Sequence, residues 1–114
     1  SFYTEGKGVA QDLKKAKQWF RKAAGQGSAG AQFSLGNMYS NGDGVTQDPK
    51  MAAKWYRKAA DQGCADAQVN LGIMYHHGEG VAGDRKKAAH WWQKAADQGH
   101  ADAQQILMQM HDMP

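Results

Sequence analysis

The apolar residues of this chain recur at helical spacing in a series of short segments. One segment, residues 29–40, places apolar side chains three or four positions apart, as one face of an α-helix requires, at Ala31, Leu35, Met38 and Tyr39. A second segment, residues 48–62, carries the same kind of stripe at Ala52, Trp55, Tyr56 and Ala59. The connection between them is short, so the pattern predicts a pair of antiparallel helices.

Residues with special backbone roles mark the ends of both predicted helices. Gly42 and Gly44 follow the first stripe and can adopt positive φ, so we expect the first helix to end there. Asp48 precedes the second stripe, where its carboxylate can accept backbone N–H groups, and Pro49 suits the first helical position. Gly63 ends the second helix.

The helix pair is repeated along the chain with a period of 36 residues. Residues 28–63 and 64–99 share 21 of 36 aligned positions without a gap. Residues 1–27 repeat the later part of the unit, including its Gly-x-Gly-Val loop at residues 6–9, and residues 100–114 repeat the first helix. We therefore expect a partial repeat, two full repeats and a C-terminal capping helix, because stacked pairs bury stripes that one pair cannot.

Glycines and aromatic residues keep fixed places in this repeat. Gly36 and Gly72 fall in the middle of the predicted first helices, where glycine costs about 1 kcal/mol relative to alanine. We expect them to let the second helix of each pair approach closely. The recurring aromatic residues are expected to pack in the core and between helix pairs; they are Trp19, Phe20, Trp55, Tyr56, Trp91 and Trp92.

The recurring residues form a combination that is specific to one family. They are Ala31-Gln32, Leu35-Gly36-x-Met38-Tyr39, Gly42-x-Gly44-Val45, Asp48, Ala52, Trp55-Tyr56 and Lys58-Ala59-Ala60-x-Gln62-Gly63. This combination resembles the Sel1-like repeat family, which is related to the tetratricopeptide repeat. The resemblance implies an all-α fold, a right-handed α-solenoid of antiparallel helix pairs, in which the first helices line a concave wall.

The same resemblance implies a non-catalytic function. Members act as protein–protein interaction scaffolds or adaptors in bacterial envelope, secretion and signalling assemblies, binding a partner protein or peptide. Other members are inhibitors or immunity proteins that cover a partner enzyme, which is the alternative reading. Cysteine-rich Helicobacter members close each repeat with a disulfide. This chain departs from them because Cys64 is its only cysteine, so their ligands are not carried over.

Some positions on the predicted first helices change between repeats while the packing residues stay the same. Such a split is expected of a common scaffold that carries a specific surface. We predict that these positions bind the partner and call them the variable surface, which consists of Phe33, Asn37, Ser40, Asn41, Asp66, Val69, Ile73, His76, His77, Gln105 and Gln109.

The charge distribution offers a second function class. The chain has 14 lysine and arginine residues against 11 acidic ones, a net charge of +3, and 13 of the basic residues lie on the predicted second helices. A basic stripe can bind nucleic acid or anionic lipid, and this stays the weaker alternative. Because the net charge is small and no aromatic side chain is left free to stack on bases, we expect a solvated outer face and no nucleic-acid partner.

No residue pattern in the chain indicates catalysis, a cofactor or a metal. The Gly-x-Gly-x-x-Gly letters at residues 78–83 follow a predicted helix, whereas a dinucleotide site follows a strand, so we interpret them as the interhelical loop. His76 and His77 are adjacent and point about 100° apart, so they cannot bind a metal as an i, i+4 pair does. Cys64 is interpreted as a weak helix cap, with a reactive thiol as the alternative.

The ends of the sequence bear on association and location. Phe2 and Tyr3 stand in the register of Met38 and Tyr39, so we expect the chain to begin at the tail of a first helix, with apolar surface that permits self-association. No signal-peptide pattern follows Ser1, and no segment is apolar enough to span a membrane. The compartment stays open between a bacterial periplasmic or secreted location and the cytoplasm.

Overall fold

The computed structural model describes residues 7–111, and all regular structure in that range is helical. The helices are α1 (Lys7–Gly25), α2 (Ala29–Asn41), α3 (Pro49–Asp61), α4 (Ala65–His77), α5 (Arg85–Asp97) and α6 (Ala101–His111). The first helices of the repeats are α2, α4 and α6, and the second helices are α1, α3 and α5. Phe2 and Tyr3, and with them the expected end of an earlier first helix, lie outside the described residues.

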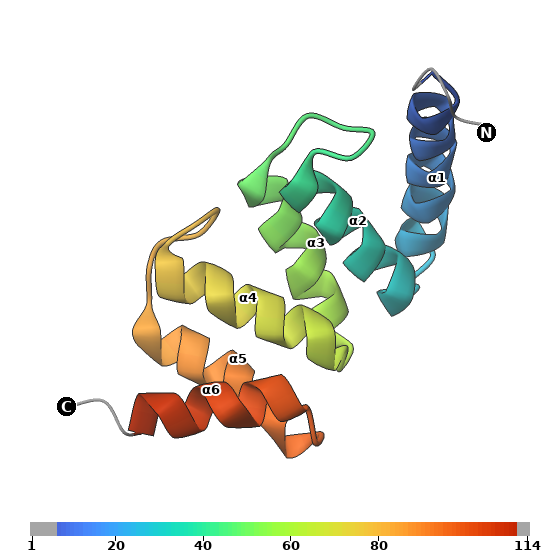
Figure 1. Cartoon of the computed structure of the whole chain (residues 1–114). Coiled ribbons are helices and arrows are strands. Elements are labelled where there is room, and N and C mark those ends of the chain that lie inside the picture. Colours follow the sequence, from blue (N-terminus) through green and yellow to red (C-terminus); the bar gives the residue numbers. More distant parts are fainter. Residues whose placement is uncertain (1–6, 112–114) are drawn as a thin grey trace.

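The helices stack in chain order into an elongated array (Figure 1). Each helix packs against the next one along the chain, most extensively within the pairs α2–α3 and α4–α5. The array measures 50 × 28 × 27 Å, with α1 and α6 at opposite ends. The predicted α-solenoid of antiparallel helix pairs is confirmed.

The residues expected to end the helices do so. The Asp48 carboxylate accepts hydrogen bonds from the backbone N–H groups of Lys50 and Met51, and Asp84 caps α5 in the same way. Gly42 ends α2 at φ 76° and Gly78 ends α4 at φ 68°, a region that L side chains rarely enter. The two interhelical loops therefore follow from the glycine and aspartate positions.

The mid-helix glycines make room for an aromatic ring rather than for a helix backbone. A Cβ atom on Gly36 would lie 2.6 Å from the Tyr56 ring, and one on Gly72 would lie 2.5 Å from the indole nitrogen of Trp92. Tyr56 and Trp92 are 3% exposed and belong to the main core, which also contains Leu71 and several fully buried alanines. The glycines thus let a large side chain of the second helix lie against the first helix of the same pair.

Buried glutamines connect successive repeats. Gln32 donates its side-chain amide to the carbonyl of Ala24 at the end of α1, and its carbonyl accepts a hydrogen bond from Gln62 at 2.8 Å. Gln68 repeats both contacts one unit later, with Ala60 and Gln98. Each glutamine therefore links its own helix to the ends of two second helices, and it adds a second hydrogen bond to a carbonyl that also accepts the backbone N–H of Gly27 or Gly63.

The start of α1 differs from the prediction. The repeat register predicts an interhelical loop at residues 6–9 and a helix cap at Asp12, but α1 already begins at Lys7. The later loops are held by backbone hydrogen bonds to the preceding first helix, such as Asp48 N–H to the carbonyl of Tyr39. The corresponding carbonyl belongs to Tyr3, outside the described residues. Lys7, Ala10 and Gln11 favour a helix in this segment, although Gly8 and Val9 do not.

The three recurring tryptophans do not share one environment. Trp91 is 5% exposed and lies in the main core, and Trp55 is half-buried against the cluster of Ala24, Ala31, Leu35 and Met38. Trp19 is 65% exposed, so its predicted place in the core is wrong. The reason is its position at the end of the array: Arg57 of α3 covers the Trp91 ring, and no described helix precedes α1 to cover Trp19 in the same way.

Candidate protein-interaction surface

Three hollows lie along the first helices, and most of the variable surface lines them. The polar hollow, about 270 Å³, opens between α2 and α4. The middle hollow, about 440 Å³, opens between α4 and α6, and the apolar hollow, about 280 Å³, lies where α4, α5 and α6 meet. The variable-surface residues that line them are Asn37, Ser40, Asn41, Val69, Ile73, His76, His77, Gln105 and Gln109.

Ile73 joins these hollows into one surface. Its side chain lines all three of them, and it is 38% exposed although it is a large aliphatic residue. It lies near the C-terminal end of α4, the middle one of the three first helices. Ile73 lines the apolar hollow together with Ile106 and Met110, and contiguous apolar surface with a polar rim, rather than one exposed side chain, is typical of an interaction site.

Two predicted residues lie outside the hollows, and one that lines them is buried. Phe33 is half-buried, and its ring packs 5.8 Å from that of Tyr56, which places it against the core. Val69 lines the middle hollow but is only 7% exposed. Asp66, which is exposed, lies in the first turn of α4 and takes part in a contact between repeats.

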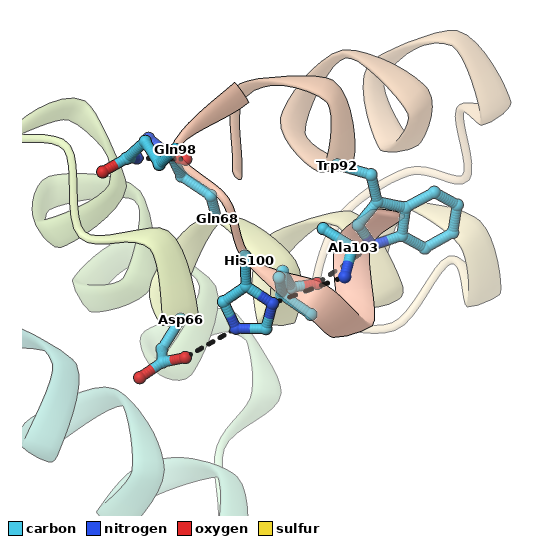
Figure 2. A network of polar contacts seen from close by, with 7 residues as sticks. Asp66, Gln68, Trp92, Gln98, His100 and Ala103 are labelled. Atoms are coloured by element: carbon cyan, nitrogen blue, oxygen red, sulfur yellow. Dashed lines mark hydrogen bonds and ion pairs between the residues drawn. The ribbon is translucent and has the colours of Figure 1, made fainter. Parts of the chain in front are cut away.

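Asp66 contacts the residue that caps the last helix (Figure 2). His100 precedes α6, and its Nδ1 atom accepts the backbone N–H of Ala103 at 3.3 Å. A neutral imidazole ring then carries its proton on Nε2, which lies 2.8 Å from the Asp66 carboxylate and can donate to it. Asp66 therefore anchors α6 on α4 in addition to being accessible.

Tyr56 supplies the polar floor of the polar hollow. Its phenol donates a hydrogen bond to the side-chain carbonyl of Asn37, so a core residue and a variable-surface residue are directly joined. Burial raises the pKa of the Tyr56 phenol above its ordinary value of 10.0, and the polar neighbours Ser40 and Asn70 oppose that rise in part. The polar hollow thus presents amide and hydroxyl groups around the buried ring of Tyr56.

The repeat itself matches a known family. Residues 1–28, 29–64 and 65–100 each match the Sel1 repeat. The chain belongs to the Sel1 repeat family. Sel1 repeat proteins are in general protein-interaction scaffolds and typically non-catalytic. Among proteins with curated descriptions, none matches the chain.

Solved structures of bacterial Sel1 repeat proteins resemble this one. A protective antigen of uropathogenic Escherichia coli with an SLR fold has a TM-score of 0.80 and 42% identity over 89% of this chain and 22% of its own. A Sel1 repeat protein from Oxalobacter formigenes has a TM-score of 0.78 and 46% identity over 82% of this chain and 27% of its own. This chain therefore spans about a quarter of the length of these two proteins.

A third similar structure belongs to the cysteine-rich group. Cysteine rich protein B of Helicobacter pylori has a TM-score of 0.76 and 33% identity over 79% of this chain and 68% of its own. The present Sel1 repeats contain one cysteine, Cys64, which precedes α4 and makes no side-chain hydrogen bond to the helix. The helices here pack without a disulfide.

Further residues of the Sel1 repeats contribute to the hollows beyond those predicted. Asn70 lines the polar and middle hollows, and Ile106 lines the middle and apolar ones. Both occupy the repeat position of Ser34, so this position also changes between repeats and the same sequence signal identifies it. Arg85 and Trp92 come from α5, a second helix, and comparison of the first helices alone could not reveal them.

The basic residues of the second helices lie partly over aromatic rings. The Arg57 guanidinium and the Lys94 ammonium lie 5.4 and 5.2 Å from the Trp91 ring centre, and the Lys58 ammonium lies 4.8 Å from that of Trp55. Cation–π contacts of this kind are worth about 0.5–1 kcal/mol at exposed sites. These cations therefore help cover the core aromatic residues of the array.

Between residues 7 and 111, no three or more histidine, cysteine or acidic side chains gather as they would around a metal ion. None of the helices α1 to α6 has the length and apolar character needed to cross a bilayer.

Proposed function

We propose that this chain is a non-catalytic scaffold that binds a partner protein or peptide on its variable surface, the concave wall expected of first helices in this family. The observation that carries the proposal is the position of Ile73, an exposed aliphatic residue that lines three adjoining hollows. The hollows border on rigid helices, so a partner would bind at little cost in ordering the scaffold.

The division between changing and constant positions supports the same proposal. Gly36 and Gly72, Gln32 and Gln68, and the cap residues Asp48 and Asp84 carry the packing that the structure describes. Most residues that line the hollows differ from repeat to repeat instead, apart from Met74 and Met110, which share the repeat position of Met38. An inhibitor or immunity protein that covers an enzyme would use this same surface, and the identity of its partner would distinguish it from an adaptor.

Binding of anionic surfaces through the second helices is the weaker alternative. Arg57, Lys58 and Lys94 lie against tryptophan rings, which ties part of the basic stripe to the core. This alternative predicts binding to nonspecific DNA or anionic vesicles that weakens steeply with salt.

Selection of peptides from a random display library on the purified chain tests the proposal. The selected peptides are then measured on Ile73→Lys and on Met108→Lys. The control is matched because Met108 is a 69% exposed apolar residue of α6 that lines none of the three hollows. We expect Ile73→Lys to weaken binding at least tenfold and Met108→Lys to leave it unchanged, since loss of a central hot-spot residue costs about 2 kcal/mol or more and a tenfold change needs about 1.4 kcal/mol. Equal affinities for the two variants would refute the proposal.

A further inference from the structure

The apolar hollow joins an aromatic floor to a positive charge. Ile73, Ile106 and Met110 supply apolar surface above Trp92, which is 3% exposed and is held in place by the hydrogen bond from its indole nitrogen to the carbonyl of Val69. Arg85, the first residue of α5, lines the same hollow and is exposed. No carboxylate lines the hollow within the described residues, and Arg85 forms no ion pair there.

Two histidine rings extend the apolar floor. The His76 ring lies 5.7 Å from that of Trp92 with a tilt of 47°, and the His77 ring meets His76 edge to face at 5.1 Å. Both histidines line the hollow and remain exposed. Their rings offer flat surface and N–H donors beside Arg85, so the hollow can surround an apolar group while polar donors stay within reach.

The neighbouring hollows carry the opposite charge. Glu79 lines the polar hollow and Asp102 lines the middle hollow, so positive charge along this surface is confined to the apolar hollow. For a partner that lies along this surface, the apolar hollow favours a carboxylate, and the polar and middle hollows disfavour one. Such an arrangement selects partners by charge pattern as well as by shape.

We propose that the apolar hollow receives an aliphatic side chain of a peptide segment whose adjacent residue is acidic, with the carboxylate placed on Arg85. This proposal rests on the proposed function, because it names the chemistry of the partner at the same surface. A guanidinium group can donate two parallel hydrogen bonds to a carboxylate, and Ile73, Ile106 and Met110 provide the contact area for the aliphatic group. The partner chemistry is therefore an acidic segment with an aliphatic residue, such as Asp-Leu-Asp.

Nuclear magnetic resonance titration of the indole N–H of Trp92 tests this proposal on the full chain. The signal is assigned by its loss in Trp92→Phe, and the probes are two capped peptides with the cores Asp-Leu-Asp and Lys-Leu-Lys. We expect the acidic peptide to shift the signal in a saturable way and to bind at least tenfold more tightly than the basic peptide. Increasing salt is expected to reduce that difference.

Charge reversal supplies the matched comparison. Arg85→Glu is expected to invert the preference between the two peptides, and Lys54→Glu, which makes the same charge change at an exposed position of α3, is expected to preserve it. The helix should tolerate Arg85→Glu because a carboxylate at a helix N-terminus is favourable. Equal binding of both peptides, no shift with the acidic one, or a preference unaffected by Arg85→Glu would each overturn the proposal.

The outcomes also separate this proposal from the one on which it rests. Selected library peptides could depend on Ile73, contain no acidic residue and bind Arg85→Glu with unchanged affinity. That result would leave the proposed function standing and refute the acidic partner. Library peptides that bind Ile73→Lys as well as the wild-type chain would refute the proposed function itself. A Trp92 signal that shifts with protein concentration alone would assign the hollow to a second copy of the chain and would also overturn the acidic partner.

Discussion

The indole ring of Trp92 lies over Gly72, and its nitrogen donates a hydrogen bond of 3.2 Å to the carbonyl of Val69 on the same helix as Gly72. One aromatic side chain thereby fixes α5 against α4 and forms the floor of the apolar hollow. The stability of the helix pair and the shape of the proposed binding surface depend on the same contact.

Substitution Gly72→Ala should therefore destabilise the chain although alanine is the better helix former. The new methyl group would lie 2.5 Å from the Trp92 indole nitrogen, so the ring must move. Overpacking of a core costs about 1–3 kcal/mol, and the gain in helix propensity returns about 1 kcal/mol. We expect the free energy of unfolding in urea to fall by about 1 kcal/mol, as the difference of these two effects.

Gly30→Ala is the control for this experiment. Gly30 lies in α2, where a Cβ atom would meet no other atom within 4 Å. The same substitution should leave stability unchanged or raise it by up to about 1 kcal/mol. Equal effects of the two substitutions would contradict the close contact between Gly72 and Trp92.

The glutamine contacts between repeats predict a second stability difference. Gln68→Ala removes the donor to Ala60 and the acceptor of Gln98, and the site is buried. A hydrogen bond contributes about 0.5–1.5 kcal/mol net, so we expect the loss of two of them to lower the unfolding free energy by about 1–3 kcal/mol. Gln104→Ala breaks the equivalent bond to Ala96 at an exposed site and should cost less. A larger loss for Gln104→Ala than for Gln68→Ala would argue against the role assigned to Gln68.

Cys64 allows the contribution of a side-chain cap to the stability of α4 to be measured. It occupies the cap position of α4 without a side-chain hydrogen bond, whereas Ser28 at the same repeat position accepts the backbone N–H of Ala31 at 3.2 Å. Thermal and urea unfolding should show Cys64→Ser to be about 1 kcal/mol more stable than Cys64→Ala, because only serine can accept the N–H group. Identical stability of the two variants would show that a side-chain cap at this position does not contribute to the stability of α4.

The buried phenol of Tyr56 predicts a loss of stability at alkaline pH. Its pKa is raised in the folded chain, so the protonated form is favoured there relative to the unfolded chain. Above about pH 10 the unfolded chain releases this proton first, and the unfolding free energy should fall until the pH passes the folded pKa. Tyr56→Phe removes this contribution, so its stability should decline less over the same pH range. Parallel pH profiles of the two proteins would contradict the raised pKa.

The repeat made most of the fold predictable from the residues alone. Helices α2 to α5 begin and end where Asp48, Gly42 and their counterparts indicate, because caps and positive-φ glycines act locally. The start of α1 was not predictable in this way. A loop held by bonds to a preceding helix depends on that helix as well as on its own sequence.

The surface was only partly predictable for a related reason. Changes between repeats identified Ile73 and Asn37, because a first-helix side chain that is not needed for packing is free to vary. They could not identify Arg85, since residues of three helices form the apolar hollow and this one comes from a second helix. Trp19 and Trp91 likewise share a register but differ in exposure, because burial depends on the neighbouring repeat.

Chemical-shift mapping with a library-selected peptide is the most direct test of where the chain binds. Backbone amide signals are recorded with and without the peptide and assigned to the helices of the array. We expect the largest changes at Asn37, Ile73 and Gln109 of the first helices, with little change along the solvent-facing side of α1, α3 and α5. Largest changes on those second helices, with an unaffected Ile73, would contradict the claim that the variable surface binds the partner.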